Sequence, residues 1–305
     1  MTRLEAIILT VMTASTPLLI AAIGELVVEK SGVLNLGVEG MMIMGAACGI
    51  VAAIATGSGA LGVAAAVLAG MAMAALFAAL TLGLAANQVA AGLALTIFGI
   101  GLSGVVGAAH VGAQRAGIGK VEIPLLADIP LLGPILFNQD PLVYASFALT
   151  ACVAWFLTRS KAGLVLRACG ESAASAHALG YPVLRIRFLA ILFGGACAGL
   201  AGAYLSLVLT PFWTSGMTAG RGWIALAIVV FASWLPWRAA LGAYLFGGIT
   251  ILQLHAQSAG FRVPPQLMSA LPYLITIVVL VLIMRIRRGG TAGPAGLGLP
   301  FVPDR

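Results

Sequence analysis

The chain has 305 residues, of which 61% are hydrophobic and 8% are charged, and its mean hydropathy is +1.11. Soluble domains carry roughly 25% charged residues, so this composition excludes a water-soluble globular protein. The net charge of +7 does not indicate a nucleic-acid partner, because the Lys and Arg residues cluster in a few segments between apolar runs. The composition therefore predicts an all-α polytopic membrane protein, in which abundant Gly and Ala let helices approach closely.

Apolar runs of about 20 residues, the length that crosses a bilayer, recur along the chain. The predicted spans, in order, cover residues 6–28, 33–55, 60–83, 89–109, 141–158, 188–210, 223–235, 238–255 and 270–284. We count nine transmembrane helices, within a range of eight to ten, because the run at 223–235 is short enough to be a half-span. The first run is too long for a signal peptide and a second follows almost at once, which favours a first span over a cleaved leader.

Basic residues give the predicted orientation. The segment 159–187 carries a single acid, Glu171, against five basic residues: Arg159, Lys161, Arg167, Arg185 and Arg187. Arginines also follow the last span, so the positive-inside rule places both this segment and the C-terminus in the cytoplasm. We expect residues 1–288 to form one transmembrane domain, followed by a flexible Gly- and Pro-rich cytoplasmic tail over 289–305.

The most unusual stretch is residues 31–46. It lies between apolar runs, yet it carries four glycines, an amide at Asn35 and a carboxylate at Glu39. We expect a broken helix here, and helical spacing would place the two polar side chains on one face. Because polar, Gly-broken backbone is costly in lipid, the pair either lines a translocation path or hydrogen-bonds the neighbouring backbone. Asn87 and Gln88 occupy a tight corner between two spans, where a turn role and a path role are both open.

A second informative stretch, residues 166–182, follows the predicted fifth span. Ser172 is a predicted N-cap, Gly180 is a predicted C′ glycine, and Pro182 blocks continuation of a helix. These signals predict a short capped helix from Ser172 to Leu179. Such a helix between two spans has the shape of a rigid knob that docks on another protein, although an ordered loop is the simpler alternative.

Several motifs together resemble one family of membrane proteins. They are Glu25, the run S-G-V-L-N-L-G-V-E-G-M-M at 31–42, Asn87-Gln88, Gly170-Glu171-Ser172 and Ala176-x-x-x-Gly180. This set resembles the inner-membrane permeases of ABC importers for simple sugars, nucleosides and branched-chain amino acids, and looks most like the nucleoside-type branch. The similarity extends over residues 6–285 in the same order, but the Pro that many members have two residues after the acid is Ala173 here.

The resemblance implies a transport subunit without an ATP-binding site of its own. The chain would be one transmembrane half of an importer in a bacterial-type inner membrane, pairing with a second homologous permease subunit. An ABC ATP-binding subunit would dock on the 170–182 segment, and an extracytoplasmic solute-binding lipoprotein would deliver solute to the outer loops. The coupling role falls on Gly170, Glu171, Ala176 and Gly180. Membrane lipid is the other expected partner, and nucleic acid is not.

The predicted function is import of nucleosides or related purine-like solutes by alternating access, along a path that includes Asn35, Glu39, Asn87 and Gln88. Simple sugars or branched-chain amino acids are the alternative solutes within the family. A channel or ion-coupled transporter acting alone is the alternative outside it. The sequence holds no Walker A, H-E-x-x-H or G-x-S-x-G motif, and we expect no enzymatic activity, metal or cofactor.

Overall fold

The computed structural model describes residues 3–122, 137–258 and 293–303, together with a few single residues outside these ranges. The helices of this part of the chain are α1 (Arg3–Lys30), α2 (Val38–Thr56), α3 (Gly59–Ala78), α4 (Gln88–Gly107), α6 (Pro141–Arg159), α7 (Lys161–Glu171), α8 (Ala173–Ala178), α9 (Val183–Tyr204), α10 (Arg221–Phe231) and α11 (Pro236–Ser258). The shorter elements are π-helical turns at Ala79–Gly83 and Leu205–Leu209, a 3₁₀ turn at Ala108–His110, and one antiparallel pair, β1 (Val121–Glu122) with β2 (Asn138–Gln139). The described chain is thus mostly helical, as its composition predicts.

Helix ends follow local signals in the sequence. Gly57, with a left-handed φ of 70°, ends α2, and the side chain of Ser58 caps α3 by accepting a hydrogen bond from the N–H of Leu61 (3.4 Å). Asp140 caps α6 in the same way. Pro141 takes the first position of that helix, where its missing N–H leaves no bond unmade. These caps set where the helices begin and end.

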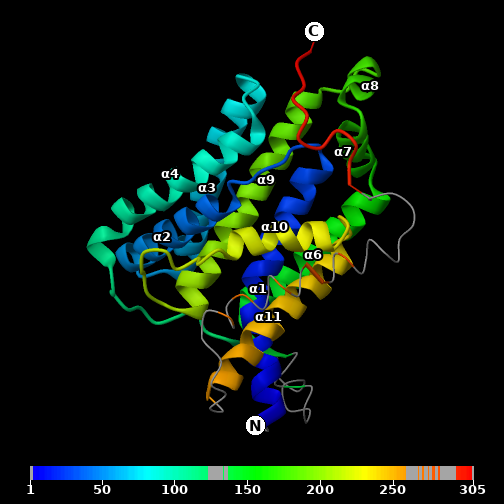
Figure 1. Cartoon of the computed structure of the whole chain (residues 1–305). Coiled ribbons are helices and arrows are strands. Elements are labelled where there is room, and N and C mark those ends of the chain that lie inside the picture. The colour runs from blue at the N-terminus through cyan, green and yellow to red at the C-terminus, as the bar shows by residue number, and fades with distance from the viewer. Residues whose placement is uncertain are drawn as a thin grey trace.

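Helix α9 lies at the centre of the bundle and packs against α1, α2 and α3 (Figure 1). Glycines make this possible: a Cβ built on Gly45 would lie 2.6 Å from the backbone of Gly199, and one built on Gly199 would lie 3.2 Å from Gly70. Backbones that touch without intervening side chains gain the dispersion contacts that drive helix association in lipid. The close packing predicted from the small residues is confirmed here.

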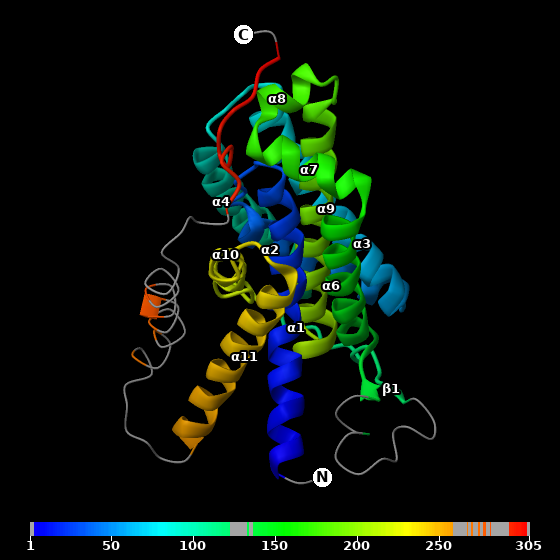
Figure 2. The same cartoon turned by 90° about the vertical axis from the view of Figure 1, so that its right-hand side faces the viewer.

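Seven of the described helices, namely α1, α2, α3, α4, α6, α9 and α11, are long and apolar enough to cross a membrane. The predicted span at 223–235 corresponds to α10, which is shorter and packs crosswise on α1; Figure 2 views α10 along its axis while α1 runs upright. The predicted last span, 270–284, falls largely outside the described residues. The described residues therefore contain seven candidate spans and not the predicted nine. They do support a multi-pass helical membrane protein.

The stretch 31–46 does not form the broken helix that the sequence predicts. Residues 31–37 are a loop between α1 and α2. Gly32 adopts a φ of 90°, and Oδ1 of Asn35 accepts a hydrogen bond from the N–H two residues later (2.9 Å). A local side-chain bond of this kind competes with helical bonding, so Asn35 stays in the loop and shares no helical face with Glu39.

Different segments gather at the two ends of the bundle. One end of the bundle holds the 31–37 loop, the start of α4, helices α7 and α8, and residues 293–303. We call it the basic end, because the basic residues of 159–187 lie there. At the other end, the loop after α4 pairs with the loop before α10: Gly112 donates its N–H to the carbonyl of Trp213 (3.1 Å). The described N-terminus also lies at that second end (Figure 2).

Candidate functional site

The carboxylate of Glu39, in the first turn of α2, is buried with 5% of the residue surface exposed. It accepts three hydrogen bonds, from Oγ1 of Thr218 (2.6 Å), the N–H of Gly220 (2.9 Å) and the N–H of Gly222 (2.6 Å). The two backbone donors belong to the N-terminus of α10, where N–H groups have no helical partner and the helix dipole favours a negative charge. Glu39 therefore caps α10 from another helix.

Gly222 is the residue that lets α2 and α10 meet. A Cβ built on Gly222 would lie 2.5 Å from Cα and 2.6 Å from N of Glu39, closer than real side-chain carbons approach a neighbour. Arg221 closes the preceding loop, because its guanidinium donates to the carbonyls of Met217 (2.9 Å) and Thr218 (3.3 Å). The start of α10 is thus tied to the start of α2.

Asn35 is fully buried and is bonded at both ends of its amide. Its N–H and Nδ2 donate to the two carboxylate oxygens of Glu25, at 3.2 Å and 3.4 Å, while its Oδ1 accepts from Gly37. Glu25 itself is buried in α1. These contacts hold the 31–37 loop on α1, and they match the interpretation in which the polar residues support neighbouring backbone.

Gln88 and Asn87, adjacent in sequence, have different surroundings. Asn87 is exposed and caps α4, since its Oδ1 accepts from the N–H of Ala90 (3.0 Å). Gln88 is buried, and its Oε1 accepts from the N–H of Leu34 in the 31–37 loop (2.8 Å). Its Nε2 has no hydrogen-bond partner among the described residues. A buried donor without an acceptor is uncommon and calls for a reason.

Helices α7 and α8 form a knob at the basic end (Figure 1). Oγ of Ser172 accepts a hydrogen bond from the N–H of Ser175 (3.2 Å), and Gly180 adopts a left-handed φ of 86°. The predicted capped helix is therefore confirmed. Ala176 is buried on the inner face of α8, in a small apolar cluster with Cys169 and Val183. Burial of Ala176 holds α8 against α7, because a helix this short is not stable alone.

Residues 293–303, expected as part of a flexible tail, lie along the base of this knob in the structure. The N–H of Gly296 donates to the carbonyl of Gly170 (2.9 Å), at the end of α7. The N–H of Gly298 donates to the carbonyl of Gly32 (3.1 Å), in the 31–37 loop. One short segment therefore bonds both the knob and the loop that carries Asn35.

The same segment reaches the tip of the knob. The N–H of Ala295 donates to the carboxylate of Glu171 (3.2 Å). The ring of Phe301 packs edge-on against the imidazole of His177 in α8, with ring centroids 5.5 Å apart. Phe301 also packs on the apolar cluster under α8. The exposed face of α8 stays uncovered, since Gly180 and its neighbours remain open to the surface.

Arg187, near the start of α9, hydrogen-bonds both the 31–37 loop and residues 293–303. The sequence places it among surface charges, but its side chain is buried with 1% of the residue exposed. Its Nε donates to the carbonyl of Ser31 (3.1 Å) and its Nη1 to the carbonyl of Leu299 (3.2 Å). A buried guanidinium that bonds two carbonyls fixes both chains relative to α9.

Two further buried acids have partners that the sequence does not reveal. Glu29 accepts a hydrogen bond from the indole N–H of Trp234, between α10 and α11, and Asp140 accepts one from the hydroxyl of Tyr204 (3.0 Å). The only available signal is an acid at or near the end of an apolar run. That signal marks the acid as paired, but it does not name the partner.

Comparison with protein families adds an independent finding. Residues 7–280 match the family model described as branched-chain amino acid transport system / permease component. The matched range contains the 31–37 loop, α4, the knob and α10, but it ends before residues 293–303.

Three relatives match most of the chain. Permease protein TsgC13 of Haloferax volcanii, provisionally named for glucose ABC transport, is 42% identical over 289 residues, which is 88% of each chain. The nucleoside ABC transporter permease NupC of Lactococcus lactis is 30% identical over 318 residues, 99% of this chain and 98% of the relative. The guanosine ABC transporter permease NupQ of Bacillus subtilis is 31% identical over 320 residues, with the same coverage. All three names describe ABC transporter permeases, and they differ in solute.

Proposed function

The chain belongs to this family of ABC transporter permeases, and from that premise we propose that it is the membrane-spanning subunit of an ATP-driven importer for nucleosides or related purine-like solutes. The observation that carries the proposal is the capped helix α8, which is linked through residues 293–303 to the loop beside Gln88. A transporter that works alone has no need of such a knob. A subunit driven by a separate ATPase needs one to receive movement.

We place the basic end in the cytoplasm, because an excess of Lys and Arg marks cytoplasmic loops. The C-terminus then lies in the cytoplasm, and the loops at the opposite end face the solute-binding lipoprotein. The ATP-binding subunit docks on α8, whose shape depends on buried Ala176 and on Gly180 at its end. Gly170 and Glu171 connect this docking helix to residues 293–303.

Movement of α8 has a continuous route to the centre of the bundle. Residues 293–303 pass it to the 31–37 loop, which is held by Glu25 and by Arg187. The loop leads directly into α2, and Glu39 ties the start of α2 to α10. We propose that ATP binding shifts these elements together and so opens the path alternately to the two sides.

We place the path beside Gln88. Its buried Nε2 has no acceptor among the described residues, and an oxygen atom of a passing solute would supply one. A buried donor without an acceptor costs roughly 1–3 kcal/mol, so a solute that accepts this hydrogen bond would gain free energy of binding. Asn35 and Glu39 shape the path by holding the loop and α10, and exposed Asn87 stands at its inner mouth.

The relatives support two solute classes. NupC and NupQ, named for nucleosides and guanosine, match nearly the full chain and favour a nucleoside. The 42% identity to the relative provisionally named for glucose favours a simple sugar as the second candidate. Both classes carry hydroxyl oxygens that accept a hydrogen bond from an amide nitrogen, so the proposed role of Gln88 is the same for either.

The test is uptake into proteoliposomes that hold this chain, a second permease subunit and the ATP-binding subunit, with the binding protein outside. We expect guanosine and adenosine to accumulate with ATP, and not with a non-hydrolysable ATP analogue. Uptake that persists without the ATP-binding subunit would show that the chain works alone. Accumulation of glucose in place of nucleosides would replace the solute and leave the ATP-driven class intact.

A further inference from the structure

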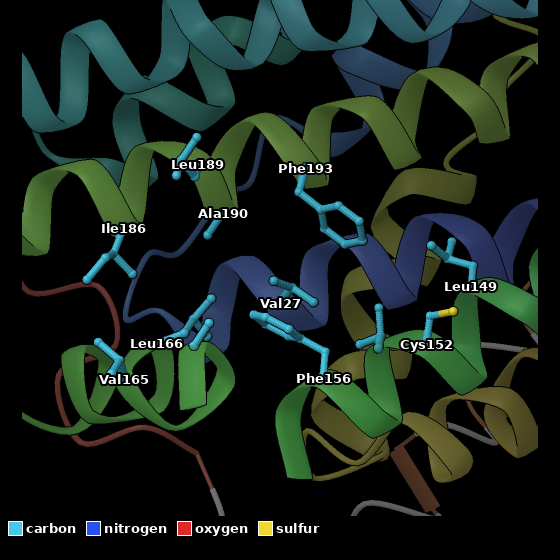
Figure 3. A pocket seen from close by; sticks show the side chains of 12 residues that line it. Val27, Leu149, Cys152, Phe156, Val165, Leu166, Ile186, Leu189, Ala190 and Phe193 are labelled. Atoms are coloured by element: carbon cyan, nitrogen blue, oxygen red, sulfur yellow. The ribbon is translucent and has the colours of Figure 1, made fainter. Parts of the chain in front are cut away.

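An apolar groove on the outer surface of the bundle contains none of the side chains to which the transport proposal gives a role. Twelve apolar residues from α1, α6, α7 and α9 line a cavity of about 500 Å³ (Figure 3). Phe193 of α9 and Phe156 of α6 point into it, with Val27 of α1 between them. Cys152 is exposed and Leu189 is 64% exposed, so the groove opens on the outer surface of the bundle. No polar residue lines it, which makes it unsuitable for a nucleoside or a sugar.

The depth of the groove fits the bilayer. Its lining residues on α9 run from Ile186 to Phe193, a rise of about 10 Å at 1.5 Å per residue. One leaflet contributes about 15 Å of hydrocarbon. The groove therefore extends over most of one leaflet, from the basic end toward the middle of the membrane.

Three cations border the groove at its basic end. Each of them is three or four residues from a lining residue in the same helix, and therefore lies about one turn away on the same face. The pairs are Arg159 with Phe156, Lys161 with Val165, and Arg185 with Leu189. All three are exposed. The only acid between residues 141 and 209 is Glu171, whose carboxylate accepts a hydrogen bond from residue 295. This rim therefore has a strong positive charge.

We propose that the groove binds one anionic phospholipid, with an acyl chain against Phe156 and Phe193 and the phosphate at the three basic residues. Only an amphiphile matches an apolar groove with cations at one end. A second protein chain seated here would need acids to meet those cations. The proposal requires neither the ATPase nor a solute, so it stands or falls independently of the transport proposal.

The first test is lipid binding by the purified full chain, delipidated in detergent and examined by native mass spectrometry. We expect one phosphatidylglycerol per chain, bound about a hundredfold more tightly than phosphatidylcholine, because each of the three basic residues near an anionic headgroup contributes roughly fivefold. Ala162→Trp fills the groove from its exposed side and should abolish this binding. Ala151→Trp, on an exposed face of α6 outside the groove, should not.

Charge variants separate the headgroup from the acyl chain. The triple change Arg159→Gln, Lys161→Gln and Arg185→Gln should remove the preference for phosphatidylglycerol, whereas Lys120→Gln, exposed on a loop away from this rim, should keep it. Equal binding of both lipids to wild type would overturn the anionic assignment. Undiminished binding to Ala162→Trp would overturn the groove itself. Self-association of wild type that Ala162→Trp abolishes would assign the groove to a second copy and overturn the lipid proposal.

The second test uses the wild-type chain and needs no folded variant. Cys152 lines the groove and is its exposed thiol. Phosphatidylglycerol should slow the labelling of Cys152 by N-ethylmaleimide about tenfold relative to phosphatidylcholine. Peptide mass mapping measures the labelling rate at this residue. Equal labelling rates in the two lipids would contradict the proposal even if every tryptophan variant failed to fold.

Discussion

The backbone N–H of Gly222 donates a 2.6 Å hydrogen bond to the carboxylate of Glu39, 183 positions away in the chain. This bond, with those from Thr218 and Gly220, satisfies the N-terminus of α10 in a region with little water. The same contact requires that residue 222 have no side chain. The contact between α2 and α10 therefore depends both on the carboxylate of Glu39 and on the absence of a side chain at residue 222.

Replacing Glu39 tests whether its role is to cap α10. Glu39→Ala leaves three donors without their acceptor and should lower the free energy of unfolding by at least about 3 kcal/mol, since each unpaired buried donor costs roughly 1–3 kcal/mol. Glu39→Gln keeps one acceptor oxygen and should cost about half. Denaturant titration in detergent measures both, with exposed Lys120→Gln as the control. If Glu39→Gln kept full stability but lost uptake, Glu39 would act on the path and not as a cap.

Gly222→Ala tests the steric half of the contact. The added Cβ meets the backbone of Glu39, and overpacking of this kind costs roughly 1–3 kcal/mol. Gly104→Ala, in α4 with open space around its position, should instead be neutral or gain about 0.5–1 kcal/mol from lower backbone entropy. Thermal unfolding of the two variants side by side gives the comparison. Equal stability would mean that α2 and α10 separate easily at this point.

Gly180→Arg tests the docking role of α8. The position has a φ of 86° and open space, so a side chain adds local strain of about 1–2 kcal/mol and projects from the knob. We expect normal membrane insertion, loss of the co-purifying ATP-binding subunit, and loss of uptake. Gly57→Arg is the matched control, with a φ of 70° and open space between α2 and α3. Retention of the ATP-binding subunit by Gly180→Arg would remove α8 as its docking site.

Phe301→Ala tests whether residues 293–303 cover the knob. Phe301 packs on the cluster that contains Cys169, and burial raises the pKa of the Cys169 thiol, so little reactive thiolate is present at neutral pH. Removing the ring should expose this thiol, lower its pKa toward the ordinary value and speed maleimide labelling severalfold. Val302→Ala, at an exposed neighbouring position, should label as slowly as wild type. Identical rates for the two variants would show that the segment does not shield the knob.

Gln88→Met tests the proposed path. The change keeps the volume but removes the unpaired Nε2, so we expect a KM for uptake raised about tenfold, together with a modest stability loss from the bond to Leu34. Thr158→Ser, at an exposed position in α6, should leave KM unchanged. Protein yield and unfolding temperature serve as folding controls. An unchanged KM for Gln88→Met would move the path away from this residue.

The sequence alone predicts the features that depend on neighbours in the chain. Apolar runs of sufficient length predict the seven long helices, and Ser172 with Gly180 predicts α8. Hydrophobic length and capping are local properties, because they are satisfied within one or two helical turns.

Only the tertiary structure decides the partners of buried polar groups. Asn35 and Glu39 are four residues apart, yet one bonds Glu25 in α1 and the other bonds the start of α10. Arg187, part of a basic segment in the sequence, is buried between two carbonyls. A buried polar atom must be paired because lipid and tightly packed helices offer no water, so the sequence signals that a partner exists. Which partner it is depends on how distant helices pack, and no local pattern encodes that.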